Sequence, residues 1–292
     1  MLYHLEIVIM KKINSIIFAV PLLLTFSANA ESETALPSCG ENCTYTIENN
    51  VLTVKPIDLS QPASVREYNR DCTGGCHTDA PWYGQGITTI NIEAGITDIA
   101  PHAFEDMATV TSLLLPEGLK TIGYEAFNAT GNITSLKLPS TLTSIGMHSF
   151  GFLPLEEIND IPAGMTSIPD YAFHGSKITD WVIPATVTTI SKDAFGSNAY
   201  SWGDDALVIN LYCEEAIASQ CEAALQWRKD NGVETKVIPY QTTSNGQVFY
   251  NNKWYDSAND ILSNNYAKKR IYTIDEANKV SGRKNTFKIR YK

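Results

Sequence analysis

The sequence has few charged residues, and basic residues are the scarcer kind. Charged residues make up 18% of the 292 residues, and 22 lysines and arginines stand against 32 aspartates and glutamates, for a net charge of −10. An acidic chain repels phosphate backbones, so nucleic acid is excluded as a partner of the whole chain. Disorder throughout is also excluded, because hydrophobic residues reach 43%.

Long apolar runs are missing after residue 30, so no later segment is predicted to span a bilayer. Before that point, Lys11 and Lys12 precede an apolar stretch from Ile13 to Phe26 and a small-residue cleavage site at 28–30. This pattern is typical of a secretory signal peptide, and a buried core helix is the alternative. We expect residues 1–30 to be the signal and the protein to be exported to the periplasm, the cell surface or the medium. Met10 begins a better-formed signal than Met1, so we also consider it as the start.

Catalytic motifs are missing as well. The sequence has no nucleophile-elbow, metalloprotease, phosphate-loop or dinucleotide pattern. Acidic pairs such as Glu156 and Glu157 are adjacent, and adjacent residues of a strand point to opposite faces, so they do not make a glycosidase pair. We therefore predict no catalytic residue and no cofactor, and we predict that the protein is not an enzyme.

Cysteine is sparse, and it occurs in three close pairs. An even number of cysteines in an exported chain predicts disulfides. A zinc site made by the four N-terminal cysteines, with His77 beside them, is the alternative. The sequence leaves the connectivity open, because six cysteines allow many pairings. The pairs are Cys39 with Cys43, Cys72 with Cys76, and Cys213 with Cys221.

Five aligned segments dominate the middle of the chain. They are IAPHAF (99–104), IGYEAF (122–127), IGMHSF (145–150), IPDYAF (168–173) and ISKDAF (190–195), and their phenylalanines are spaced 23, 23, 23 and 22 residues apart. Prolines 116, 139, 162 and 184 repeat at the same period, 23, 23 and 22. Each unit predicts a short strand, a proline-led turn and a return limb, with the phenylalanines stacked in the core. The third copy, with Leu155, Ile158 and Ile161, is one residue longer, so we expect a bulge there.

The repeating pattern L-x2-L-x-L-P-x2-L-x2-I-G-x2-A-F resembles the Treponema-type, or BspA-like, leucine-rich repeat of bacterial surface proteins over about residues 87–240. The resemblance implies an α/β repeat solenoid, an arc with a parallel β-sheet on its concave face. It also implies adhesion or contact with host or cell surfaces, by analogy of fold.

The two ends of the repeats are predicted to carry caps, because a solenoid end exposes apolar core. Residues 31–86 are the expected N-terminal cap, tied by the first four cysteines. They contain a strand-like stretch at 44–54 with an Asn-Asn turn and an APWY element that often precedes the first repeat in this family. A strand at 206–212, a helix at 214–228 and a strand at 237–240 complete the region 87–240 as a helical C-terminal cap.

Residues 241–292 are predicted to be a small appended basic module. Nine of the 22 basic residues lie in 268–292, which gives that segment a net charge of +7. A solvated basic face is the alternative to a contact with an anionic envelope polymer. The candidate polymer contacts are Lys268, Lys269, Arg270, Arg283 and Lys284.

Residues between the inward positions of each strand point to the concave face, because side chains alternate along a strand. They form the candidate binding face, with ordinary solvation of a polar sheet face as the alternative. The residues are Asn91, Leu114, Lys137, Asn159, Val182 and Asn210.

Two histidines, His102 and His148, hold the same position in copies one and three. Strands stacked about 4.8 Å apart would separate them by ~10 Å, too far to share one zinc ion. We expect a solvent-facing column that also contains Glu125, Tyr171 and Asp193, and we predict no metal site.

The sequence supports two functional hypotheses. The first is an exported scaffold that recognises a protein or a glycan. The second is a structural envelope-associated protein held by its basic module. An enzyme with an unrecognised site comes third.

Overall fold

The computed structural model describes residues 36–71, 77–196, 208–244, 246–251 and 253–263. The expected signal peptide, Cys72, Cys76, the insertion at 198–205 and the basic segment 268–292 lie outside the described residues. Within them, no helix has the length and the hydropathy needed to cross a membrane.

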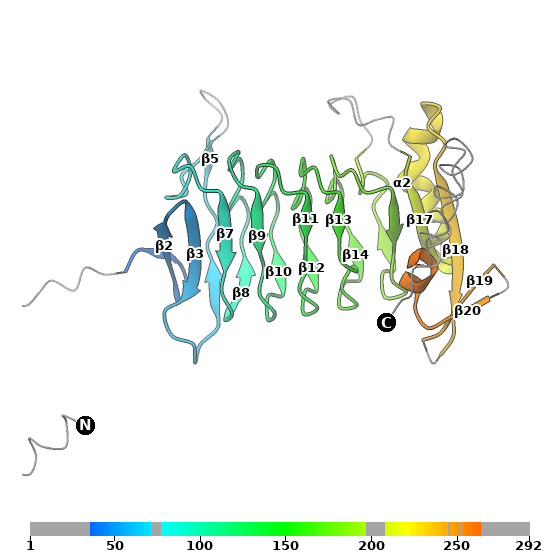
Figure 1. Ribbon diagram of the computed structural model, residues 1–292, viewed down its shortest axis with the longest axis horizontal. Coiled ribbons are helices and arrows are strands. Elements are labelled where there is room, and N and C mark those ends of the chain that lie inside the picture. The colour runs from blue at the N-terminus through cyan, green and yellow to red at the C-terminus, as the bar shows by residue number, and fades with distance from the viewer. Residues whose placement is uncertain (1–35, 72–76, 197–207, 245, 252, 264–292) are drawn as a thin grey trace, which may run out of the picture. The chain divides into compact units, whose positions relative to one another are not determined.

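Each repeat contributes two short strands, and equivalent strands of successive copies lie side by side (Figure 1). The pairs that form are parallel, with Ser112 opposite Thr89 in the first row and Thr121 opposite Asp98 in the second. The return limb of each copy is therefore itself a strand, which the sequence did not predict. Row one comprises β7 (Thr89–Ile92), β9 (Ser112–Leu114), β11 (Ser135–Leu136), β13 (Glu157–Ile158), β15 (Asp180–Val182) and β17 (Asn210–Glu214). Row two comprises β8 (Ile96–Ile99), β10 (Thr121–Ile122), β12 (Ser144–Ile145), β14 (Ser167–Ile168) and β16 (Thr189–Ile190).

The turns that follow row two are also bonded from copy to copy. The backbone N–H of His102 donates to the Tyr124 carbonyl at 3.0 Å, and that of Phe104 donates to the Ala126 carbonyl at 2.8 Å. Equivalent bonds recur in the next copies, as from Glu125 N–H to the Met147 carbonyl at 3.0 Å. The turns therefore align neighbouring copies as the strands do.

The core contains the column of phenylalanine rings that the repeat predicts. Phe104 and Phe127 stack with ring centroids 5.2 Å apart, and the column continues to Phe150 at 5.8 Å and Phe173 at 5.9 Å. All four rings are buried. Trp181, which was predicted to point inward, lies between Phe173 and Phe195 at 4.8 and 5.0 Å from their rings. The stacked column is confirmed.

The third copy is irregular, as its extra residue predicts. The strand β13 pairs with β11, but in the described residues no ladder joins it to β15. The side-chain amide of Asn159 occupies the place of a peptide group. Its Oδ1 accepts the Leu138 N–H at 2.7 Å, and its Nδ2 donates to the Leu138 carbonyl at 2.9 Å.

The N-terminal segment joins both rows by strand pairing. The hairpin of β2 and β3 turns at Asn49 and Asn50, which have φ of 51° and 64°, and confirms the predicted Asn-Asn turn. The strand β3 pairs with β7, and β4 pairs with β8. Trp82 of the APWY element stacks on Phe104 at 5.2 Å and extends the aromatic column. The strands are β1 (Ser38–Gly40), β2 (Cys43–Glu48), β3 (Val51–Pro56), β4 (Ala63–Val65), β5 (Arg70–Asp71) and β6 (His77–Thr78).

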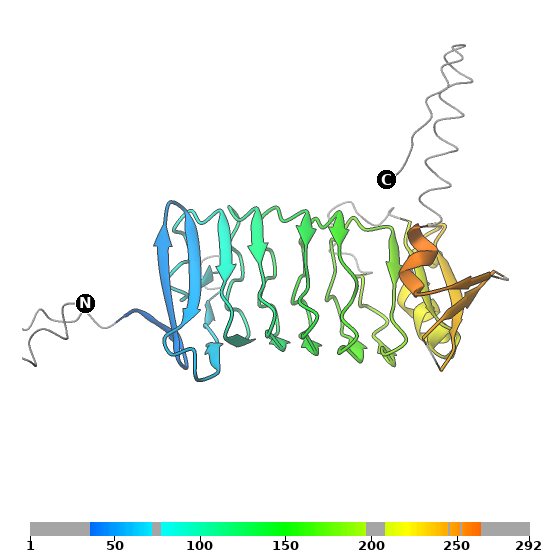
Figure 2. The same cartoon turned by 60° about the horizontal axis from the view of Figure 1, so that its bottom comes forward.

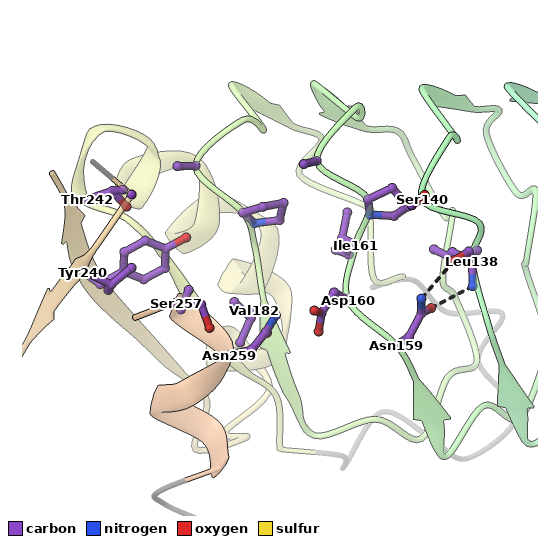
Figure 3. Close-up of a pocket in the computed structure, with 17 residues that line it drawn as sticks. Leu138, Ser140, Asn159, Asp160, Ile161, Val182, Tyr240, Thr242, Ser257 and Asn259 are labelled. Carbon is purple, nitrogen blue, oxygen red and sulfur yellow. Dashed lines mark hydrogen bonds between the residues drawn. The ribbon is translucent and has the colours of Figure 1, made fainter. Parts of the chain in front are cut away.

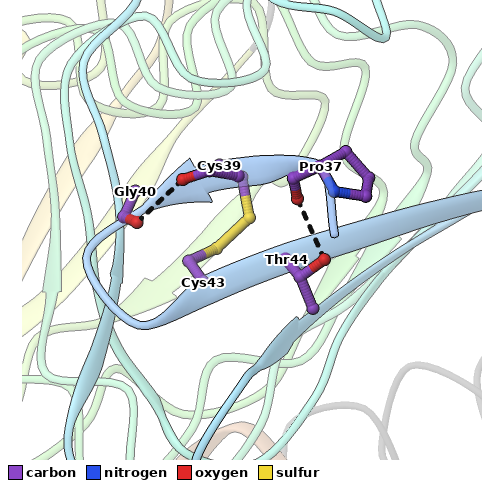
Figure 4. The surroundings of a disulfide bond; sticks show 6 residues. Pro37, Cys39, Gly40, Cys43 and Thr44 are labelled. Carbon is purple, nitrogen blue, oxygen red and sulfur yellow. Dashed lines mark hydrogen bonds between the residues drawn. A yellow bond between two sulfur atoms is a disulfide. The ribbon is translucent and has the colours of Figure 1, made fainter. Parts of the chain in front are cut away.

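One disulfide is present in this segment, between Cys39 and Cys43 (Figure 4). It closes the tight connection between β1 and β2, where Thr44 Oγ1 also donates to the Pro37 carbonyl at 2.9 Å. The first predicted cysteine pair is therefore confirmed as a local bridge.

The C-terminal segment ends both rows. The predicted helix is present as a 3-10 turn, η2 (Glu215–Ile217), followed by α2 (Ala218–Asp230). Gln220 of α2 accepts the Ile190 N–H at 2.9 Å and donates to the Thr188 carbonyl at 3.0 Å, so it occupies the place of the next strand. The buried guanidinium of Arg228 donates to the carbonyl of Gly196 at 2.5 Å.

The same segment continues row one without a break. The strand β18 (Lys236–Thr242) pairs with β17, and it runs through residue 241, where the appended module was expected to begin. A hairpin around Asn251 consists of β19 (Val248–Tyr250) and β20 (Lys253–Tyr255), and β19 pairs with β18. Residues 258–263 form a helical turn that lies against row one (Figure 2).

The third predicted disulfide is not formed. Cys213 of β17 and Cys221 of α2 are both buried free thiols. The hydrogen bond with Cys213, together with burial, raises the pKa of the Cys221 thiol far above its ordinary value. The pattern of close pairs alone could not distinguish a bridge from two packed thiols, because both fill the same small apolar space.

We expect Phe127→Ala to lower the free energy of unfolding by about 3–5 kcal/mol, the range for truncation of a buried phenylalanine. Denaturant titration of the two proteins measures the difference. The exposed Phe152, at 40% of its full surface, is the matched control, and Phe152→Ala should have a much smaller effect. Equal effects of the two substitutions would contradict the stacked column.

We expect Cys213 and Cys221 to resist alkylation in the folded protein and to react once it is unfolded without reductant, because both thiols are buried and the raised pKa of Cys221 lowers its thiolate fraction further. Peptide mapping by mass spectrometry separates these two from the other cysteines. A 213–221 disulfide peptide from the unreduced protein would show that the pair is oxidised.

Candidate functional site

Asn91 of β7 lies opposite Leu114 of β9 in row one, but Asn210 of β17 lies opposite Asp180 and not Val182, so the last candidate falls outside the predicted column. Leu113 of β9 is buried, while its neighbour Leu114 keeps 53% of its surface exposed. Lys137 is exposed in the next copy, and Asn91 of β7 is half-buried. We call the side of row one that carries Leu114 and Lys137 the outer face of row one.

Hydrogen bonds within this face already engage two of the amides that the sequence suggests for recognition. Asn159 is exposed, but its amide is tied to the Leu138 backbone. Asn210 Nδ2 donates to Asp180 Oδ1 at 3.0 Å, and Thr179 Oγ1 donates to Asp180 Oδ2 at 2.8 Å. These amides stabilise the face and are not free to bind a ligand.

Val182 also differs from the expectation of an open strand face. It packs against an apolar cluster of Tyr212, Tyr240, Val248 and Ile261. The strands β18 and β19 and the helical turn at 258–263 supply most of this cluster and cover that end of the outer face. The repeat spacing did not place this segment against Val182, because the segment lies beyond the copies that the spacing aligns.

A groove lies where the open part of the outer face meets this C-terminal segment (Figure 3). Its volume is about 420 Å³, within the range of sites that bind small ligands or short segments. Copies three and four supply one side, with Asp160, Ile161 and Val182. The C-terminal segment supplies the other, with Thr242 and Asn259.

The groove depends on the irregular third copy. In copy two a single residue, Lys137, separates the inward Leu136 from Leu138, whereas in copy three both Asn159 and Asp160 separate Ile158 from Ile161. Asn159 is fixed by Leu138, and Asp160 then projects between Asn159 and Val182 (Figure 3). The extra residue was visible in the sequence, but the wall that makes it part of a groove was not.

Residues 79–200 match the model of the BspA type leucine rich repeat region in six copies. The match confirms the resemblance found in the sequence, and it covers both rows except β17. A search of curated proteins gives no match to the chain.

Among solved structures, the chain is similar to leucine-rich repeat proteins of bacteria. A leucine-rich repeat protein from Eubacterium ventriosum is 18% identical, with a TM-score of 0.44 over 61% of this chain and 43% of that one. The pneumococcal vaccine antigen PcpA is 21% identical, with a TM-score of 0.37 over 52% and 36%. A leucine-rich cell surface protein from Faecalibacterium prausnitzii is 11% identical, with a TM-score of 0.30 over 70% and 94%. The chain thus spans less than half of the first two proteins.

The turns that follow β8 and β10 carry a charged cluster in which both carboxyl groups are buried. Arg70 of β5 lies 2.7 Å from Glu125 and 3.1 Å from Glu105, measured from Nη1 to the carboxylate oxygens. His102 Nδ1 lies 2.7 Å from Glu105. Glu125 is only 6% exposed, so it does not belong to a solvent-facing column as expected. The hairpin of β5 and β6, which supplies Arg70, draws it into an ion pair.

The two carboxyl groups of this cluster titrate differently. Burial and the neighbouring Glu125 raise the pKa of Glu105 to about 7, against the pull of His102 and Arg70. Burial also acts on Glu125, but hydrogen bonds from Tyr124 and Glu105, with the charge of Arg70, hold its pKa below the ordinary value. One proton is therefore held on Glu105, and the negative charge resides on Glu125.

His102, Glu105 and Glu125 have donor atoms within 4.8 Å of one another, close enough to hold a metal ion. The guanidinium of Arg70 already supplies a positive charge at hydrogen-bonding distance from both carboxylates. The arrangement is that of an ion-pair cluster, which holds β5 to the repeats. His148, the second histidine of the predicted column, stacks on Tyr171 at 4.6 Å.

Several candidate residues lie outside the described part of the chain. They are the polymer contacts Lys268, Lys269, Arg270, Arg283 and Lys284 and the cysteines Cys72 and Cys76.

We expect Glu105→Gln to flatten the pH dependence of stability. Unfolded Glu105 has a pKa near 4.5 and folded Glu105 has one of about 7, so the folded state binds the extra proton between these values. Wild-type stability therefore falls as the pH rises from about 4.5 to about 7, and glutamine removes that loss.

Urea denaturation at pH 5 and pH 8 measures this change, and the variant should gain roughly 1–3 kcal/mol relative to wild type across the interval. The exposed Glu48 provides the control, because Glu48→Gln should leave the slope as it is. An unchanged slope in Glu105→Gln would contradict the assigned proton.

Proposed function

We propose that this protein is an exported binding scaffold that recognises a protein or a glycan at the cell surface or in the periplasm. Recognition takes place on the outer face of row one, from Asn91 to the groove beside Val182. The observation that supports this most is the continuity of the exposed Leu114 and Lys137 with a groove of about 420 Å³. Extended surfaces of this kind are what repeat proteins use to bind partners.

We further propose that the two terminal segments act as caps and close the repeats as a solenoid. On the N-terminal side, Trp82 is 0% exposed and covers Phe104. On the C-terminal side, Gln220 and Arg228 supply hydrogen bonds to backbone groups of the last copy. Both arrangements are what an end that would otherwise expose core and unpaired strand edges requires.

A structural role at the envelope is the second candidate, and the charge distribution favours it. Residues 268–292 carry +7 on a chain whose total is −10. In this case the basic segment would hold the protein to an anionic polymer, and high salt would release it because exposed charges are screened. A chain that ends at residue 263 separates the two functions: it should keep partner binding and lose attachment to the envelope.

The face is tested by removing its two most accessible side chains together. We expect Leu114→Ser with Lys137→Ala to weaken binding at least tenfold, about 1.4 kcal/mol. The ligand first comes from a screen of residues 31–292 against arrays of glycans and surface proteins. Asn159 is left intact, because loss of its amide would free the Leu138 backbone.

The matched control is Met147→Ser with Lys120→Ala, which removes an exposed apolar side chain and an exposed lysine outside row one. Both double variants should keep the thermal midpoint of the wild type. Equal binding by both would place recognition elsewhere on the molecule.

A further inference from the structure

The groove has a charge preference that follows from its lining. Among the described residues that line it, Asp160 is the only acidic one, and none is lysine, arginine or histidine. Tyr240 stays neutral, because burial raises its pKa and its hydroxyl donates to the Ile183 carbonyl at 2.5 Å. The groove therefore favours cations and disfavours anionic ligands.

The surroundings add to this field. Residues 36–263 hold 11 basic and 27 acidic side chains, a net charge of −16. Glu157 of β13 is exposed, while Asp180 of β15 accepts hydrogen bonds from Thr179 and Asn210. The hydroxyl and the backbone N–H of Ser140 hold the pKa of Glu117 low, and the positive charge of Lys137 adds to this effect.

The walls of the groove suit an aliphatic chain better than a sugar ring. Ile161, Val182, Pro184 and Ala258 provide apolar surface. The aromatic residue in the lining, Tyr240, is only 2% exposed and presents no ring face for stacking. Lysine and arginine run their methylene stems along apolar walls while the charged end reaches a carboxylate.

Asp160 is also held in place to receive such a group. The two hydrogen bonds of Asn159 to the Leu138 backbone fix the residue before it. In Figure 3 the carboxylate oxygens of Asp160 lie on the side of Val182 and Asn259. In the described part of the chain, no ladder joins β13 to β15 beside this position.

We propose that the groove binds an extended peptide segment of a partner protein, with a lysine or arginine side chain that pairs with Asp160. The inference rests on the proposed binding function and specifies its ligand. Asn159 is a positioning residue, and the walls formed by Ile161 and Val182 take the stem of the basic side chain.

The test is a selection of short random peptides on beads with the intact chain, residues 31–292. Selected peptides should be enriched in lysine and arginine relative to the library. One of them, labelled with a fluorophore, then serves as the probe in anisotropy titrations. Asp160→Asn should weaken its binding at least tenfold and should erase the preference for lysine over alanine in that peptide, while Glu48→Gln leaves both unchanged.

A second pair of variants tests the sign of the charge without touching Asp160. Ala163 lines the groove and is exposed, so Ala163→Lys should weaken the labelled peptide and Ala163→Glu should strengthen it, at an unchanged thermal midpoint. Added salt should shrink both effects.

Selected peptides without a basic bias, or equal effects of the two Ala163 variants, would overturn the inference. The inference would also be overturned if a ligand no longer binds the Leu114 and Lys137 double variant but binds Asp160→Asn as it binds the wild type. That last result would leave the proposed function standing. If none of these variants loses binding, both the inference and the proposed function are wrong.

Discussion

The hydrogen bonding of each repeat to its neighbours is the constraint on which the rest of this structure depends. A two-residue strand such as β10 buries too little to be stable by itself, and its backbone groups need partners in the copies before and after it. Row one, row two and the turns each supply backbone hydrogen bonds between copies. Wherever the repetition stops or slips, a side chain must replace the missing peptide group.

Amide side chains perform this replacement at several places. Asn159 bonds both backbone groups of Leu138 in the irregular third copy, and Gln220 does the same for the edge at Thr188 and Ile190. Near the N-terminus, Asn42 accepts the Asp58 N–H at 2.8 Å and donates to its carbonyl at 2.7 Å. A primary amide serves here because it carries a donor and an acceptor in one plane, as a peptide does.

The sequence predicts those features that repeat, and it misses those that depend on distant segments. The 23-residue spacing predicts the stacked rings of Phe104 to Phe173, because a residue in register must meet its own equivalent. The alternation of side chains predicts that Leu113 points in and Leu114 points out. Nothing in the spacing shows that Arg70 pairs with Glu125 across 55 residues, or that the segment after residue 240 covers Val182. Asp160 combines both cases. The extra residue of the third copy is visible in the sequence, but the groove that Asp160 lines is not.

Because amide side chains replace missing peptide groups between copies, their hydrolysis affects how the copies are held together. Hydrolysis of Asn159 or Gln220 to the acid preserves the shape of the side chain and removes its donor, which sets a carboxylate against the carbonyl of Leu138 or Thr188. Amides are among the thermally labile side chains, and the damage would fall on the joints of the stack rather than on its apolar interior. Deamidation would therefore weaken the hydrogen bonds that hold neighbouring copies in register.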